Sequence, residues 1–116
     1  YLPFTFTIRC TDILRSFIFL KILINDNKKI LFFGTTMYQE RNIHNLIEDF
    51  KDEIPMYLNN KKIINTILKI RLKKGEKNYL SNLLNCYQVL IKKKFIQKRE
   101  IKYLKAWISD IKKLNL

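Results

Sequence analysis

The first charged group in the sequence consists of Arg9, Asp12 and Arg15, placed where an alternating residue pattern gives way to a helical one. A helix N-terminus exposes free backbone N–H groups, and two nearby guanidinium groups suit the binding of a diphosphate. This spacing therefore predicts an anion site. The competing interpretation is that Asp12 caps the helix and pairs with Arg15, while Arg9 lies on the surface.

The second polar cluster contains Gln39, Glu40, Arg41, Asn42 and His44. These side chains gather between a predicted strand and a predicted helix, a position that active-site loops commonly occupy. All but the glutamine are therefore candidate substrate-binding residues. The alternative is an ordinary helix start, with Asn42 as the cap, Glu40 compensating the helix dipole and a structural role for His44.

A run of acidic residues follows, with carboxylates at Glu48, Asp49, Asp52 and Glu53. Carboxylates four residues apart on a helix repel each other unless a cation or a basic neighbour is close. A metal is conceivable there, but we favour an acidic helix face that packs against the lysine-rich second half of the chain. That interpretation also explains why the charges segregate by half.

Hydrophobic periodicity predicts the elements that would position these residues. Alternation over Tyr1 to Arg9 predicts a strand, and Thr11 or Asp12 then caps a helix that runs to about Ile24. A short strand of the buried type follows at Lys29 to Phe33. Strand, helix and strand in this order indicate an α/β layer.

Beyond the second strand the sequence shows only helical spacing. An amphipathic helix is predicted to run through Phe50, and Pro55 is expected to separate it from the next one. Apolar stripes predict three further helices, at residues 58–68, 80–91 and 101–114. On this basis residues 1–54 form an α/β part, and residues 55–116 form a helical subdomain that packs on it.

The helical part carries the charge excess of the chain. The net charge is +13, and residues 59–116 hold 16 Lys/Arg against 3 Asp/Glu. A basic half suggests nucleic acid as a partner. Most of these residues are lysines rather than the arginine forks that suit guanine or phosphate, so we expect no nucleic-acid partner. Trp107 is expected to anchor the last helix.

The scarcity of glycine, histidine and cysteine excludes several classes of function. The two glycines, Gly34 and Gly75, lie too far apart to form a phosphate-binding loop, which excludes ATPase and Rossmann functions. A single histidine and the separated Cys10 and Cys86 argue against a zinc site and leave one disulfide open. The most apolar stretch, residues 13–24, contains two charges and is shorter than the roughly 20 residues of a membrane span.

Four spaced motifs in the first half resemble one family. They are Tyr1-Leu2-Pro3-Phe4, Ile8-Arg9-Cys10-Thr11-Asp12-Ile13-Leu14-Arg15-Ser16, Gln39-Glu40-Arg41-Asn42 with His44-Asn45-Leu46, and Asp49-Phe50-Lys51-Asp52-Glu53. Together and in register they resemble the C-terminal part of the STELLO-type glycosyltransferases. The resemblance extends to about Asn60, and the helical tail carries no recognised motif.

The resemblance implies the C-terminal portion of a nucleotide-sugar-dependent transferase domain of the GT-A kind, usually found in a Golgi membrane protein. The sequence starts at Tyr1 within a strand-like alternation, as expected for an internal start. The membrane anchor and an Asp-x-Asp motif that binds a divalent cation would then precede Tyr1. The implied partners are a nucleotide-sugar donor, an unknown acceptor and the upstream part of the same domain. The segment alone is expected to be inactive.

Asp12 is the candidate catalytic residue that this resemblance implies, within an Arg-x-x-Asp-Ile-x-Arg segment. A carboxylate there would orient or deprotonate an acceptor hydroxyl. Arg9 and Arg15 would balance the diphosphate leaving group. Two other functions remain open: a small basic helical module that binds nucleic acid or an acidic surface, and a non-catalytic scaffold member of the family.

Overall fold

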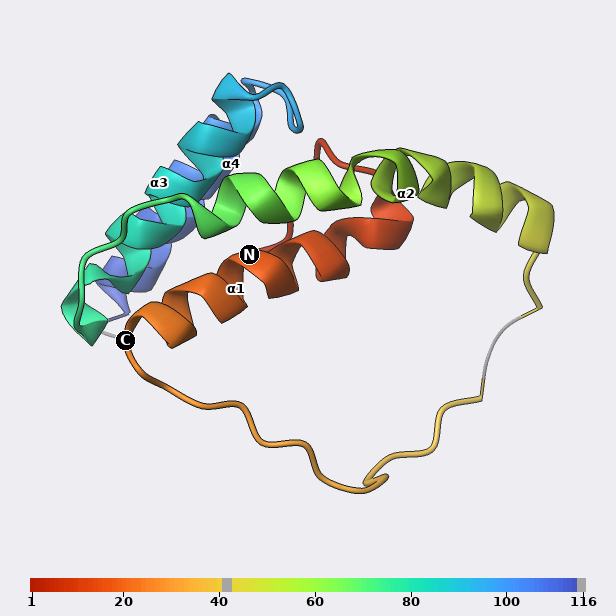
Figure 1. Cartoon of the computed structure of the whole chain (residues 1–116), viewed down its shortest axis with the longest axis horizontal. Coiled ribbons are helices and arrows are strands. Elements are labelled where there is room, and N and C mark those ends of the chain that lie inside the picture. Colours follow the sequence, from red (N-terminus) through yellow and green to blue (C-terminus); the bar gives the residue numbers. More distant parts are fainter. Residues whose placement is uncertain (41–42, 115–116) are drawn as a thin grey trace.

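The computed structural model describes residues 1–40 and 43–114, which contain four α-helices and two short 3-10 turns. In chain order these are η1 (Ile8–Cys10), α1 (Thr11–Asn25), α2 (Leu46–Leu68), η2 (Glu76–Asn78), α3 (Tyr79–Lys92) and α4 (Glu100–Lys113). The helices α1 and α2 pack on each other, α3 packs on both, and α4 packs on α3 (Figure 1). After α1, residues 28–40 loop away from the helices.

The expected α/β architecture is wrong, because the described residues form helices and no strand. The first predicted strand, Tyr1 to Arg9, forms turns that lead into η1. The second, Lys29 to Phe33, is irregular and exposed. Alternation records which side chains share a face, but a strand exists only where a neighbouring strand completes its backbone hydrogen bonds. Neither segment has such a neighbour within the described part of the chain.

Helix α1 confirms the helix predicted from Thr11 or Asp12 to about Ile24. It buries an apolar stripe at four-residue spacing that consists of Leu14, Ile18 and Ile22. Its N-cap is Cys10, without a side-chain cap hydrogen bond, so the prediction of Thr11 or Asp12 as the cap is wrong. The helix ends before Asn27, whose φ of 56° is left-handed, as is common after helix C-termini.

Helix α2 is continuous through Pro55, so the predicted break at this residue is wrong. Proline lacks an N–H and its ring crowds the preceding turn, but packing on η1, α1 and α3 holds the helix together. Asn45 caps the helix, accepting the N–H of Ile47 at 3.1 Å and that of Glu48 at 3.4 Å. The division at residues 54 and 55 falls inside α2 and stays a prediction.

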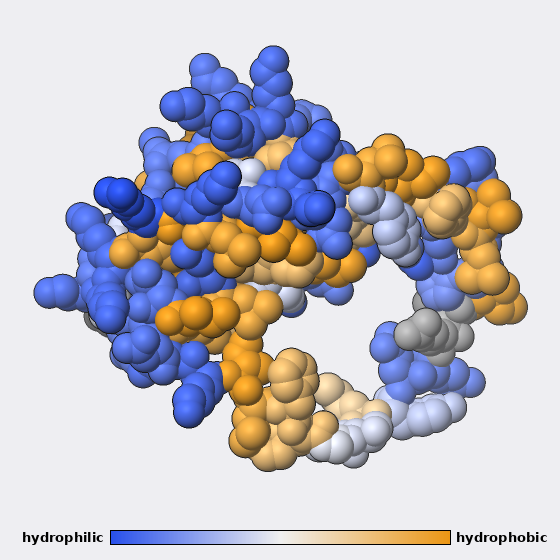
Figure 2. Space-filling model, in the orientation of Figure 1, coloured by the Kyte–Doolittle hydropathy of each residue, from blue (hydrophilic) through white to orange (hydrophobic). Residues whose placement is uncertain are grey.

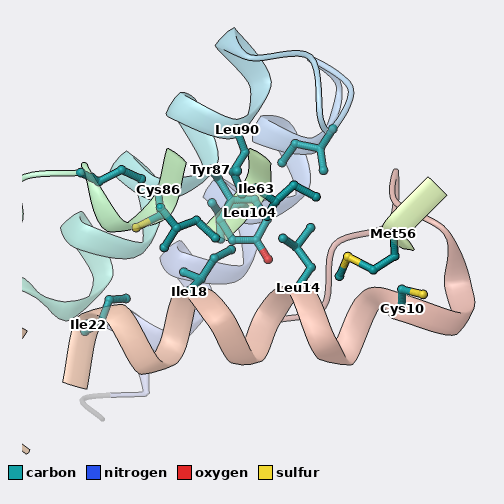
Figure 3. Close-up of a cluster of buried hydrophobic side chains, with 13 residues drawn as sticks. Cys10, Leu14, Ile18, Ile22, Met56, Ile63, Cys86, Tyr87, Leu90 and Leu104 are labelled. Atoms are coloured by element: carbon teal, nitrogen blue, oxygen red, sulfur yellow. The ribbon is translucent and has the colours of Figure 1, made fainter. Parts of the chain in front are cut away.

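The core lies where the four helices meet. Helices α3 and α4 confirm those predicted at residues 80–91 and 101–114, whereas the helix predicted at 58–68 is the second half of α2. The hydroxyl of Tyr87 is directed toward α1 (Figure 3), and burial raises the pKa of this phenol. Cys10 and Cys86 are free, and burial raises the pKa of Cys86 to about 12. The same buried cluster contains Leu14 and Ile18 from α1, Ile63 and Ile67 from α2, Leu90 from α3 and Leu104 from α4.

The carboxylate of Glu100, the first residue of α4, holds the N-terminal segment in place. This side chain is fully buried, and it accepts the N–H of Phe4 at 3.0 Å and that of Thr5 at 2.8 Å. It also accepts the hydroxyl of Tyr1. Burial, and then this hydrogen bond, raise the pKa of the Tyr1 phenol. Side-chain bonding to Glu100 therefore replaces the strand pairing predicted for this segment.

The segment between α1 and α2 exposes many apolar side chains. Phe32 is 90% exposed and Phe33 78% exposed, and their neighbours Leu31, Met37 and Tyr38 are also exposed. Figure 2 shows apolar residues along this segment where it loops away from the helices. Among the described helices, none is long and apolar enough to cross a membrane.

Candidate functional site

The start of α1 and the first turns of α2 are joined by charged side chains. Arg9 donates to Oδ2 of Asp49 at 2.7 Å, and its Nε lies 3.9 Å from Oε1 of Glu53. Nδ1 of His44 lies 3.7 Å from the same oxygen of Asp49. The hydroxyl of Thr7 donates to the carbonyl of Asp52 close by. We call Arg9, His44, Asp49 and Glu53 the Arg9 network.

The Arg9 network is partly open to solvent, and this exposure limits the strength of its ion pairs. The side chain of Asp49 is 19% exposed, whereas those of Arg9 and His44 are 33% and 40% exposed. Ion pairs at this exposure are screened by water and contribute little stability. Tyr57 donates to Glu53 at 3.1 Å, and this hydrogen bond raises the pKa of the phenol.

Asp12, the candidate catalytic residue, lies in the first turn of α1 with its side chain exposed. Its Oδ1 accepts the N–H of Ile13 at 2.9 Å. The described part of the chain supplies no ion pair between Asp12 and Arg15, so the pairing considered as an alternative is absent there. Its carboxylate is therefore accessible to a substrate.

Arg15 lies apart from the Arg9 network. It lines a groove with Tyr1 and Trp107, whereas the guanidinium of Arg9 is bound to carboxylates of α2. The three residues of the first charged group thus have three different surroundings. Their joint action on a diphosphate stays a prediction.

Of the second polar cluster, the fold brings His44 to the Arg9 network. His44 reaches Asp49 and so joins Arg9, although the two residues are far apart in sequence. Glu40 is exposed in the irregular segment. Arg41 and Asn42 lie outside the described residues, and the helix cap considered for Asn42 is Asn45 instead.

Comparison with known proteins identifies the family. A family model described as STELLO glycosyltransferases matches residues 9–116, nearly the whole chain. The chain belongs to the STELLO glycosyltransferase family. No curated protein and no solved structure matches it. The family resemblance is confirmed, and three of its four motifs lie within or largely within the matched residues, whereas Tyr1 to Phe4 lies outside them. The match also covers the helical tail, in which the sequence shows no recognised motif.

In this STELLO family member, sequence reasoning missed the partners of Arg9. Asp49 and Glu53 are four residues apart and so share one face of α2, and this face meets Arg9 rather than the lysine-rich tail. The expected packing of acidic residues on that tail is therefore wrong for this pair. The sequence did contain a signal for this contact, because two carboxylates four residues apart on a helix repel each other unless a cation lies close. The spacing alone does not show whether that cation is Arg9, a lysine of the tail or a metal ion.

The same acidic residues do not suit the metal ion that was conceivable at this acidic run. Asp49 and Glu53 already accept from Arg9 and Tyr57, and a guanidinium beside them would repel a metal ion. Within residues 1–40 and 43–114, no group of three or more His, Cys, Asp or Glu side chains is arranged to hold a metal. We derive no chemical step through a metal at these residues.

Proposed function

We propose that this chain forms the C-terminal portion of a nucleotide-sugar-dependent glycosyltransferase domain of the GT-A kind, which transfers a sugar to an acceptor. The observation that carries the proposal is the family match over residues 9–116. The apolar side chains exposed around Phe32 and Phe33 also support it, because a contiguous apolar patch commonly marks an interface. We assign this patch to contact with another part of the same domain.

Asp12 is the residue that we assign to catalysis. Its carboxylate accepts one local backbone N–H and faces solvent at the start of α1, where free N–H groups favour negative charge. In this role it orients the acceptor hydroxyl and takes its proton as the oxygen attacks the sugar carbon, while the nucleoside diphosphate leaves. The Arg9 network lies about one turn away, where Arg9 meets carboxylates of α2.

Two parts of the proposal concern what lies outside these residues. A divalent cation would be held by an Asp-x-Asp motif elsewhere in the domain, where it would neutralise the diphosphate. The intact protein is assigned to the Golgi membrane, through a segment other than the described helices. Microscopy of the tagged intact protein checks the location, and a distribution away from the Golgi would contradict it.

The experiment compares two carboxylate variants of the intact protein, with release of nucleoside diphosphate as the readout. Asp12→Asn keeps the shape and removes the charge. We expect turnover to fall about 100-fold or more, the scale of general base catalysis, with an unchanged melting temperature. Asp110→Asn, which removes an exposed carboxylate of α4, is the matched control and should keep full turnover.

Two outcomes contradict the proposal. Full turnover in the Asp12→Asn protein would remove this residue from catalysis. Absence of transfer by the wild-type protein, across sugar nucleotides and acceptors, would favour the non-catalytic scaffold instead.

A further inference from the structure

A groove separate from the Arg9 network runs between α1, α3 and α4. It has a volume of about 440 Å³, within the range of small-molecule sites. The aromatic side chains of its wall come from four different parts of the chain, namely Tyr1, Phe19, Tyr79 and Trp107. Arg15 and Ser16 supply polar groups at the edge, and Ile22, Leu80 and Leu83 complete the lining.

The aromatic wall is held rigidly from behind. The rings of Tyr1 and Trp107 have centroids 6.0 Å apart, and Tyr1 also meets Tyr87 edge-on at 5.4 Å. The hydroxyl of Tyr1 is bound to the buried Glu100. The hydroxyl of Tyr79 donates to Asp26 at 2.8 Å. Because both phenol groups are already bonded, the wall presents mainly ring surface to a ligand.

Arg15 brings to the groove a positive charge that no carboxylate of the described residues neutralises. Arg15 is exposed, and the described residues include no carboxylate in an ion pair with it. Glu100 is buried behind Tyr1 and its oxygens are occupied by three donors. Asp26 is occupied by Gly75 and Tyr79. The guanidinium is therefore available to an anionic ligand.

We propose that this groove binds a sugar residue that carries a carboxylate, as part of the acceptor glycan. The apolar C–H face of the ring packs on Trp107 and Tyr1, and the carboxylate takes the two-pronged hydrogen bonds that Arg15 offers. Ser16 donates its hydroxyl to the carbonyl of Asp12, which leaves its oxygen free to accept from a sugar hydroxyl.

The planar guanidinium of Arg15 matches the two oxygens of one carboxylate in geometry, and Arg15 is the single Lys or Arg side chain among the described residues that line the groove, which leaves much of the charge of a nucleoside diphosphate unbalanced. The inference rests on the proposed function, and it gives Arg15 a role toward the acceptor in place of the predicted role toward the diphosphate.

The chain offers a direct probe of this groove, because Trp107 is its single tryptophan. Its fluorescence is followed while the 116-residue chain is titrated with a glucuronate-containing disaccharide, the methyl ester of that disaccharide, and UDP. We expect saturable binding of the acidic disaccharide. The ester should bind about tenfold more weakly or worse, since it loses the charge-assisted hydrogen bonds.

Two variants of the same chemistry test the role of Arg15. Arg15→Gln should lower the affinity for the acidic disaccharide about tenfold and abolish the preference over the ester. Arg71→Gln, at an exposed arginine that does not line the groove, should leave both affinities unchanged. Phe19→Ala, which shortens the aromatic wall, should weaken both ligands alike.

The outcomes separate this inference from the proposed function. Equal affinity for the acid and the ester, no saturable signal, or tighter binding of UDP than of the acidic disaccharide each overturns it. The titration measures binding without transfer. Transfer by the intact protein without binding here would overturn the acceptor site alone, whereas binding without transfer would overturn the proposed function.

Discussion

At the scale of single residues, Glu100 combines full burial with a complete set of hydrogen-bond donors. A buried carboxylate is costly unless its oxygens are satisfied, and here two backbone N–H groups and a phenol satisfy them. These bonds join the first residues of the chain to the last helix, and so position Tyr1 in the wall of the groove.

Replacement of Glu100 by glutamine should therefore destabilise the protein. The change turns one acceptor oxygen into an N–H donor that faces another donor, and we expect a loss of about 2–3 kcal/mol in the free energy of unfolding. Urea denaturation followed by circular dichroism measures it. Glu76→Gln, which breaks only the exposed pair with Lys28, should change stability little. Equal free energies of unfolding for the two variants would show that the buried Glu100 contributes no more to stability than the exposed Glu76.

Asp26, at the other end of α1, is expected to make a contribution to folding stability that is lost in acid. The N–H of Gly75, at 2.7 Å, and then the hydroxyl of Tyr79 hold the pKa of Asp26 below its usual 3.8. Because the folded pKa is depressed, this contribution is present above about pH 4 and is lost as the pH falls through the folded value. Melting temperatures at pH 5 and pH 3 should differ less in Asp26→Asn than in the wild type. An identical acid dependence of the two proteins would contradict this assignment.

At the scale of elements, α2 contains a proline in its interior, where the backbone hydrogen bonds of a helix favour a residue with an N–H group. Pro55 has no N–H to offer the carbonyl of Lys51, and its ring crowds the preceding turn. The neighbouring Asn59 donates its side-chain amide to the Pro55 carbonyl at 2.8 Å. Tertiary packing thus maintains a helix that the local sequence disfavours.

Replacement of Pro55 by alanine should stabilise α2, because it restores a backbone donor and removes the crowding. We expect an increase of about 1–3 kcal/mol in the free energy of unfolding, and a gain in helical circular dichroism. Lys61→Ala, at an exposed position of the same helix, is the control and should change little. A loss of stability in Pro55→Ala would mean that the proline ring makes contacts worth more than the missing hydrogen bond.

At the scale of the whole molecule, the helices enclose one core while the segment between α1 and α2 leaves apolar side chains in solvent (Figure 2). An extended apolar segment with unpaired backbone groups readily pairs with another copy. We therefore expect the 116-residue chain by itself to associate at micromolar concentrations.

Replacement of both Phe32 and Phe33 by serine should reduce that association severalfold. Helix content should stay unchanged, because neither ring packs into the core. Static light scattering and circular dichroism provide the two measurements. Leu114→Ser removes one exposed apolar side chain at the end of α4 and should leave association nearly as it is in the wild type. A monodisperse wild-type monomer would refute the expectation.

Much of the helical structure follows from the sequence alone. The helices α1, α3 and α4 follow from apolar residues at three- and four-residue spacing, because that period is set within a single helix and needs no distant partner. The family could also be inferred, from motifs in register around Asp12 and His44. These features depend on residues near each other in the chain.

Only the tertiary structure decided which distant groups meet. The alternation in Tyr1 to Arg9 did not produce a strand, because Glu100 took the backbone N–H groups that a strand would share. Arg9 pairs with carboxylates on α2, and the ring of Trp107 packs beside that of Tyr1. A pattern of residue types specifies a helix because its hydrogen bonds are local, whereas these contacts depend on how separate elements pack, which no spacing along the chain records.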